Sequence, residues 1–296
     1  MEKYSQFRDR GSLFKKAFLW SMLGVSGVWW IDLQIDGVKR GSLAKQHAHR
    51  LPQPSDIIAS SLTSPIDALY LAAIFNPIFT ASYPHTRLVR RVSLLGAILR
   101  AFQIPQEHPT NDTELVHVRS ITSSHPNRIV VVFPECTTTN GRGILPFSPS
   151  ILSAATGSKI FPISLRYSPG DITTPVPGTY WSFLWNFLSE PTHCIRVRIA
   201  GCVFNASKPL HSPTSSDASN FLDTSPAEDS ATTSSTETLS TFERQAGDGQ
   251  TLEERKVLER TAEALARLGR SKRIGLTLKD KIAFIDAWSR QRHRRR

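Results

Sequence analysis

At 296 residues and 40% hydrophobic content, the chain is long enough for one α/β domain with appendages or for two small domains, and too apolar to be disordered throughout. Its formal net charge of +11 favours anionic partners (nucleic acid, an acidic membrane leaflet or phosphorylated small molecules) without choosing among them. Three cysteines with no paired spacing, Cys136, Cys194 and Cys202, argue against a disulfide scaffold and a zinc site, so we expect a reducing compartment and no metal.

The beginning of the chain is polar and has no secretory signal, so residues 1–12 are predicted to be a flexible N-terminus. Residues 13–31 are rich in aromatic and aliphatic side chains and carry Lys15 and Lys16 near their start. The apolar part is shorter than the ~20 residues that a membrane-spanning helix needs. We therefore expect an interfacial helix over 13–31, with its tryptophans at headgroup level and its lysines near anionic lipid. An ordinary buried core helix is the alternative.

Predicted strands and helices alternate over the next 170 residues or so. Strands are expected at residues 32–39, 57–59, 128–133, 159–167 and 195–202, and helices at residues 67–75 and 88–102. The run at 128–133 is continuously apolar and β-branched, which is typical of a strand buried on both faces. This alternation predicts an α/β fold with a mixed, mostly parallel sheet flanked by helices, in a domain that covers residues 13–204.

The last third of the chain changes in composition. Residues 205–250 are dominated by Ser, Thr, Pro and acidic side chains, which predicts a disordered linker or insertion. Thr251 and Glu254 have capping-box spacing at the start of the predicted C-terminal helices, 251–290. The basic tail, 291–296, is open to three interpretations: a disordered end, a clamp on anionic lipid headgroups, or a contact with nucleic acid. No nucleic-acid-binding module accompanies the tail, so nucleic acid is not the partner we expect.

The most informative segment is 130–147, where a buried strand runs into Pro134. Glu135, three threonines, Asn140 and Arg142 follow, and loops at the carboxyl ends of such strands are where α/β proteins bind ligands. Hydroxyls, glycine-exposed amides and a guanidinium suit an anion. On composition alone the segment is either an anion-binding loop or a plain surface turn.

These residues also carry a family resemblance. Phe133-Pro134-Glu135-Cys136-Thr137 resembles the FPEGT signature of the glycerol-3-phosphate and lysophospholipid acyltransferases. The following TTNGR (138–142), FPISLRY (161–167) and YWSFLW (180–185) are similar to later parts of the family pattern. The resemblance covers roughly residues 13–202 and is nearest to the fungal lysophosphatidic acid:oleoyl-CoA acyltransferases. It implies a helix-flanked αβ fold.

The resemblance also implies roles for particular residues. Glu135 and Thr137 would position the phosphate of the acceptor and Arg142 would pair with it. Arg100, at the end of the motif-like run GAILR (96–100), would join Arg142 around that phosphate; equally, it is one solvated charge on a basic helix. Pro162 lies in the strand that bears the last motif. Cys136 stands where the family has glycine, and the alternative of a thiol nucleophile lacks an identified histidine partner.

The first family motif, H-x-x-x-x-D, is incomplete in this sequence. Asp67 occupies the aspartate position as the candidate catalytic residue, while Leu62 occupies the position of the histidine that would take the proton of the acceptor hydroxyl. The protein is then a non-catalytic relative, or another histidine enters (His85 is the nearest candidate), or the reaction of the already activated thioester uses a different base or general electrostatic help. Asp67 itself has a simpler interpretation as a helix N-terminal aspartate favoured by the helix dipole.

The resemblance implies acyl transfer of the 1-acylglycerol-3-phosphate O-acyltransferase type, with acyl-CoA as co-substrate and no bound cofactor. Lysophosphatidic acid or a related lysophospholipid would be the acceptor, at an anionic membrane surface. The expected location is the cytosolic face of the endoplasmic reticulum or a lipid droplet, with peripheral or interfacial attachment. The nearest branch usually has a longer hydrophobic N-terminal segment, so this chain is expected to be either a shortened form or the product of a faulty gene model. The alternative function is an inactive lipid-binding or scaffold protein on the same fold.

Overall fold

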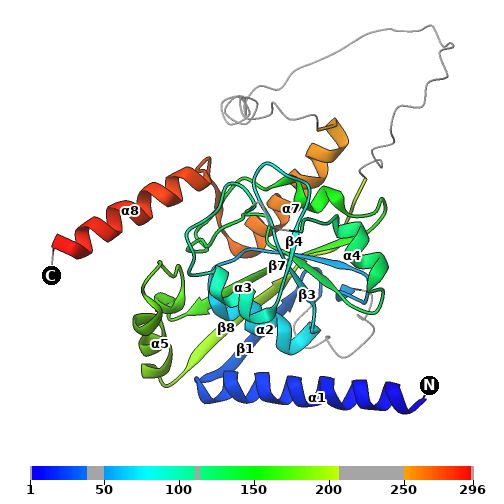
Figure 1. Cartoon of the computed structure of the whole chain (residues 1–296), viewed down its shortest axis with the longest axis horizontal. Coiled ribbons are helices and arrows are strands. Elements are labelled where there is room, and N and C mark those ends of the chain that lie inside the picture. Colours follow the sequence, from blue (N-terminus) through cyan, green and yellow to red (C-terminus); the bar gives the residue numbers. More distant parts are fainter. Residues whose placement is uncertain (1, 39–49, 111–113, 207–249, 295–296) are drawn as a thin grey trace, which may run out of the picture.

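The computed structural model describes residues 2–38, 50–110, 114–206 and 250–294 (Figure 1). Nearly all of the predicted linker, 205–250, and the last two residues of the predicted basic tail therefore lie outside the described residues.

A single mixed sheet forms the centre of the molecule, in the strand order β1-β8-β7-β2-β5-β3-β4, with β9 beside β7 (Figure 1). The strands are β1 Val28–Ile35, β2 Ile57–Ser60, β3 Ile78–Ala81, β4 Arg90–Val92, β5 Val130–Val132, β7 Lys159–Ser168, β8 His193–Ile199 and β9 Val203–Phe204. Neighbouring strands are parallel from β7 through β2 and β5 to β3, and between β1 and β8. The predicted α/β class with a mixed, mostly parallel sheet is confirmed.

Helices cover both faces of this sheet, because its central strands are buried on both sides. On one face α1 Glu2–Val25, α2 Pro65–Phe75, α3 Leu94–Arg100 and α5 Tyr180–Ser189 enclose a core that includes Ile58 and Val131. On the other face α4 Val118–Ser124, the 3₁₀ helix Pro149–Ser153 and α7 Leu252–Gly269 enclose Ile57, Val130 and Val132. Alternate residues of each strand thus serve two cores.

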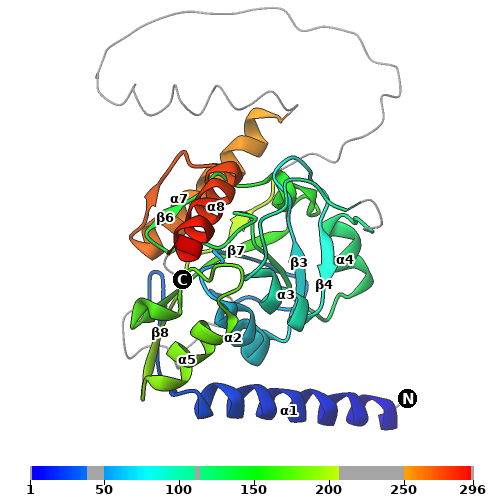
Figure 2. The ribbon, with the colours of Figure 1, turned by 60° about the vertical axis from the view of Figure 1, so that its left-hand side comes forward.

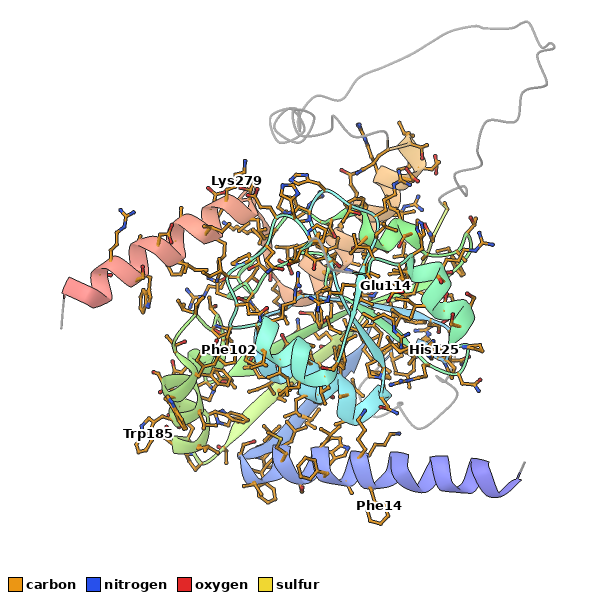
Figure 3. All side chains as sticks on the ribbon, in the orientation of Figure 1. Phe14, Phe102, Glu114, His125, Trp185 and Lys279 are labelled. Carbon is orange, nitrogen blue, oxygen red and sulfur yellow. The ribbon has the colours of Figure 1, made fainter. Side chains whose placement is uncertain are left out.

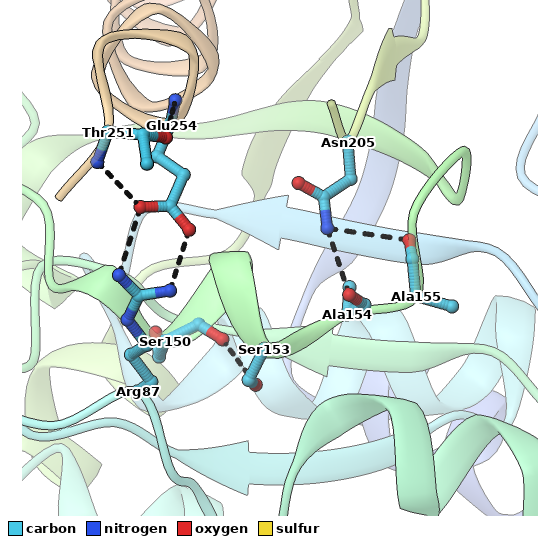
Figure 4. Close-up of polar contacts among 8 residues, drawn as sticks. All are labelled: Arg87, Ser150, Ser153, Ala154, Ala155, Asn205, Thr251 and Glu254. Carbon is cyan, nitrogen blue, oxygen red and sulfur yellow. Dashed lines mark hydrogen bonds and ion pairs between the residues drawn. The ribbon is translucent and has the colours of Figure 1, made fainter. Parts of the chain in front are cut away.

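The C-terminal helices differ in how they join this domain. Thr251 caps α7, and the Glu254 carboxylate accepts a hydrogen bond from the Thr251 amide (2.9 Å) in the predicted capping box. The same carboxylate accepts hydrogen bonds from both terminal guanidinium nitrogens of Arg87 (2.6 and 2.9 Å; Figure 4). These bonds connect α7 to the segment before β4. α8 Leu278–Arg294 extends away from the sheet (Figures 1 and 2), and residues 291–294 of the predicted tail continue this helix.

The predicted helix over 13–31 is wrong at its C-terminal end. α1 ends at Val25, the chain turns at Gly27 with φ of +83°, and residues 28–31 belong to β1. Gly27 is needed there because a side chain would approach the Pro191 carbonyl oxygen to 2.8 Å. The bulky, partly β-branched run after it favours an extended strand. Residues 2–12, predicted as a flexible N-terminus, continue α1.

The predicted helix over 88–102 is wrong in its first half. Residues Arg90–Val92 form β4, which pairs antiparallel with β3, and α3 begins only at Leu94. Ser93 separates the two elements, because its hydroxyl accepts a hydrogen bond from the Gly96 amide (3.0 Å) and caps α3. The other predicted strands and helices lie within a few residues of observed ones.

Candidate functional site

Asp67 lies at the carboxyl end of β2, where α2 begins, and is fully buried. Its Oδ2 accepts hydrogen bonds from the backbone amides of Thr63 (2.6 Å) and Ser64 (2.9 Å), and the Thr63 hydroxyl adds a third (3.1 Å). Its Oδ1 accepts a short hydrogen bond from the hydroxyl of Tyr167 on β7. Three of these bonds converge on Oδ2, and Tyr167 occupies Oδ1, so a histidine bound to Oδ1 would have to share that oxygen with Tyr167.

The electrostatics of Asp67 follow from this environment. Burial raises the pKa of its carboxyl to about 6, although the hydrogen bonds from Tyr167, Ser64 and Thr63 oppose that rise. Ser64 and Asp67 form a capping box on α2. The contacts of Asp67 are therefore those expected of an aspartate at a helix N-terminus. The predicted catalytic role of this residue stays a prediction.

Leu62, at the motif histidine's position, is 4% exposed and packs into the core beneath α2. It borders a cavity of about 10 Å³, together with Arg100, Phe133, Cys136 and five other residues. Within the described part of the chain no histidine is hydrogen-bonded to Asp67. The ring of His85 is exposed and faces that of His108, with 6.1 Å between centroids.

The predicted anion-binding loop after β5 folds directly against this motif. The amide of Thr139 donates a hydrogen bond to the Leu62 carbonyl (2.9 Å), which joins two segments that lie 77 residues apart. Glu135 is 2% exposed and accepts a hydrogen bond from the Leu145 amide (3.1 Å). Burial raises the pKa of Glu135 to about 8, because the bond from Leu145 only partly offsets the loss of water.

Cys136 has φ of +59°, in the left-handed region. This conformation explains why the FPEGT signature has glycine at this position, since a β-carbon there is sterically unfavourable. Burial raises the pKa of the Cys136 thiol to about 12, and the thiol contacts the Pro134 carbonyl. A neutral, enclosed thiol is poorly suited to act as a nucleophile.

The other predicted site residues fall in different places. Thr137 is buried within the loop, and Arg142 is exposed at its far end. Arg100 borders the Leu62 cavity, donates to the Ser82 carbonyl (3.1 Å) and lies 5.1 Å from the centroid of the Tyr83 ring. Pro162 is buried inside β7, and its carbonyl accepts a hydrogen bond from the Ala200 amide (3.0 Å).

Two residues at the end of β7 belong to the site and carried no role in the sequence analysis. Tyr167 holds Asp67, and the guanidinium of Arg166 donates to the Gly141 carbonyl at the far end of the loop (3.1 Å). In the sequence, the signal that could have identified these two residues is their position after the apolar part of a predicted strand. β7 runs parallel to β2, so its carboxyl end arrives where the Leu62–Asp67 segment starts.

Comparison with known proteins points to the same segments of the chain. Residues 43–166 match a protein-family model described as Acyltransferase, and that span holds both Asp67 and the loop after β5. The resemblance to this family that was inferred from the sequence is therefore confirmed.

One curated relative refines the match. A protein of Schizosaccharomyces pombe, named "Putative lysophosphatidic acid:oleoyl-CoA acyltransferase", is 27% identical over 239 residues, which is 81% of this chain. The chain spans 64% of the length of that relative. No solved structure gives a significant match.

Proposed function

We propose that the protein transfers a fatty acyl group from acyl-CoA to the free hydroxyl of lysophosphatidic acid or a related lysophospholipid at a membrane surface. The observation that carries this proposal is the hydrogen bond from the Thr139 amide to the Leu62 carbonyl, which joins the two motif segments at one edge of the sheet. The family match and the name of the relative support the same class of reaction.

In this reaction the acceptor hydroxyl oxygen adds to the thioester carbonyl, the carbon–sulfur bond breaks, and coenzyme A leaves with the proton that the hydroxyl gives up. A thioester is already activated, so the protein's main contributions are orientation and charge stabilisation. Arg142, exposed at the end of the loop, is the residue we assign to the acceptor phosphate. Glu135 and Thr137, being buried, would support the loop from within.

An exposed apolar surface supports the membrane part of the proposal. α5 leaves Trp181, Leu184, Trp185 and Leu188 exposed, at the spacing of one helix face. Phe14 on α1 and Trp185 on α5 point away from the sheet (Figure 3).

The ends of α1 and α5 are fixed beside each other, because the His193 amide donates to the Gly27 carbonyl (2.7 Å). Their exposed aromatic side chains therefore suit insertion at headgroup level. Among the described helices, none is long and apolar enough to cross a membrane. We propose peripheral attachment to the cytosolic face of the endoplasmic reticulum or of a lipid droplet.

A second candidate function is lipid binding without catalysis. It is favoured by Leu62, which cannot accept a proton, and by the hydrogen bonds that Asp67 already accepts from Ser64 and Tyr167. In that case the same site would hold a lysophospholipid and leave it unchanged.

Acyl transfer from labelled oleoyl-CoA to lysophosphatidic acid in vesicles tests both functions. The native protein is compared with Leu62→His/Tyr167→Phe, which restores the motif histidine and removes the hydroxyl that now occupies Asp67 Oδ1. Leu62→Gln/Tyr167→Phe is the matched control, being polar but without a base. Product from the native protein supports the proposed function.

Product from the histidine variant alone, with lysolipid still bound by the native protein, supports the second candidate. If none of the proteins forms product and none binds lysolipid, both functions are contradicted.

A further inference from the structure

One face of the sheet at its β1–β8–β7 end is rich in arginine. Along β8, Ile195 and Val197 are buried, whereas Arg196 and Arg198 point to the other face. The antiparallel register places Arg166 of β7 directly opposite Arg196. Two like charges in directly opposed positions repel each other and are destabilising unless something compensates them.

Loops bring further arginines to the same place. Burial lowers the pKa of Arg166, and the positive charges of four other arginines lower it further: Arg198, Arg196, Arg142 and Arg270. The hydrogen bonds of Arg166 and Arg198 go to neutral main-chain carbonyls, those of Gly141 (3.1 Å) and Leu268 (2.8 Å). These contacts orient the guanidinium groups without neutralising their charge.

β1 and the turn after it bring two carboxylates to this face. Asp32 of β1 is in register with Arg196, and Asp36 forms an ion pair with Arg267. They stand against Arg166, Arg196, Arg198 and Arg270, besides Arg267 itself, and Arg142, which we assign to the acceptor phosphate, lies at the border of this face. Among the described residues, the face therefore keeps an excess of fixed positive charge.

A groove of about 520 Å³ opens beside these arginines. Residues 34–38 form one wall, and Arg198, Arg267, Leu268 and Arg270 form the other. Glycine is favoured at position 37 in the first wall, because the backbone there has φ of +72°, in the left-handed region. The size of the groove is that of pockets that bind small molecules.

This arginine face adjoins the candidate site. Arg166 precedes Tyr167, the residue that holds Asp67. The Gly141 carbonyl accepts a hydrogen bond from the guanidinium of Arg166 and another from the hydroxyl of Ser271 (2.6 Å). On its other side, Gly141 lies against the methyl group of Thr63, which would be 3.5 Å from a β-carbon at Gly141. One loop residue thus separates the arginines from the Asp67 motif.

We propose that the arginine face binds a ligand carrying several phosphate groups, and that this ligand is the 3′-phosphorylated ADP end of acyl-CoA. The identification rests on the proposed function, in which the acyl donor needs an anion site apart from its thioester. Guanidinium groups hold phosphates through paired, charge-assisted hydrogen bonds.

The position of this face favours a dissolved ligand over a lipid headgroup. α1 and α5 pack on the face of the sheet that buries Ile195 and Val197, which is opposite to Arg196 and Arg198. The exposed aromatic side chains of α1 and α5 lie on that opposite side, whereas the exposed Trp29 and Trp30 belong to β1. The arginines therefore point away from the helices that would meet the bilayer.

Calorimetric titration with adenosine 3′,5′-bisphosphate and with free coenzyme A tests this proposal. The native protein is compared with Arg196→Gln/Arg270→Gln and with Arg119→Gln/Arg255→Gln, a control that removes the same charge from exposed positions elsewhere. We expect both probes to bind about tenfold more weakly for each phosphate-binding guanidinium that the first variant removes, and little change in the control. Equal thermal unfolding of the two variants establishes that folding is intact.

Absence of binding to the native protein, or an equally weakened affinity in the control, would overturn the proposal. It would also be overturned if the first variant kept its affinity for both probes and failed only to bind phosphatidic acid vesicles. The titrations contain neither an acyl donor nor a lysolipid, so the binding of both probes is read independently of turnover. Probe binding without acyl transfer contradicts only the proposed function, whereas acyl transfer with an unchanged KM for acyl-CoA in the first variant contradicts only this inference.

Discussion

Replacing Glu135 by glutamine should stabilise the protein, and by more as the pH rises. The carboxyl is buried, and its pKa is raised from 4.5 to about 8, so the folded state disfavours the ionised form. The stability contributed by neutral Glu135 is fully present below about pH 4.5 and is lost as the pH rises towards 8. Glutamine has nearly the same shape and stays neutral, so it avoids this loss.

The size of the effect follows from the shift in pKa. A rise of about 3.5 units sets a ceiling of about 5 kcal/mol, which is reached only above pH 8. Between pH 5 and pH 7 the free energy of unfolding of Glu135→Gln should gain about 2.5 kcal/mol on that of the native protein. For a domain of this size that corresponds to about 5–10 °C in Tm.

Urea unfolding of both proteins at pH 5, 6, 7 and 8 measures the difference directly. The titration of Asp67 is common to both proteins and largely cancels. Glu263→Gln, at an exposed position, is the matched control and should show no such trend. The reasoning from burial would be refuted if the difference in free energy of unfolding between Glu135→Gln and the native protein stayed constant or decreased from pH 5 to pH 7.

Three further outcomes are expected. Glu254→Ala should lower the free energy of unfolding by about 3 kcal/mol in urea denaturation, because it leaves Arg87 without its paired carboxylate; a decrease below about 1 kcal/mol would show that the pair does not anchor α7. Cys136→Gly should be more stable to urea than Cys136→Ala by about 1 kcal/mol, since only glycine relieves the left-handed backbone, and the reverse order would contradict this account. With a thiol reagent at pH 8, Cys194 and Cys202 should react in the native protein and Cys136 only after unfolding; prompt labelling of Cys136 would show that its thiol is accessible.

Much of the sheet could be predicted from local sequence. The runs at 57–59 and 128–133 contain consecutive apolar residues, and such residues form central strands because both faces of a parallel sheet are covered. Thr251 and Glu254 predicted the start of α7 correctly, since a capping box is a local signal.

The errors arose where tertiary pairing outweighs local pattern. Residues 28–31 are as apolar as the helix before them, and only Gly27 and the partner strand β8 make them a strand. Arg90–Val92 continues a helical spacing of apolar residues, yet β3 offers a free edge that it pairs with. Neither partner is visible in a window of local sequence.

The residues of the candidate site likewise fall into those that local sequence reveals and those that depend on tertiary pairing. Asp67 and the loop from Glu135 to Arg142 could be found because each lies within one short segment. The contact of Tyr167 with Asp67 spans 100 residues and depends on how β7 runs beside β2. The arginine face likewise depends on the register of two strands, which no spacing in the sequence reveals.

The replacement of the motif histidine and the contact of Tyr167 are physically linked. A buried carboxylate without its imidazole partner would keep one oxygen without a donor, at a cost of about 1–3 kcal/mol or more for a charged group. Tyr167 supplies that donor, and burial together with the charge of Asp67 raises its pKa well above 10, so it stays protonated. The Leu62–Asp67 segment is therefore stable without a histidine, and its intact geometry is no measure of turnover. Only the chemistry of the bound lysolipid, compared between Leu62→His/Tyr167→Phe and its glutamine control, separates a working transferase from a lipid-binding relative.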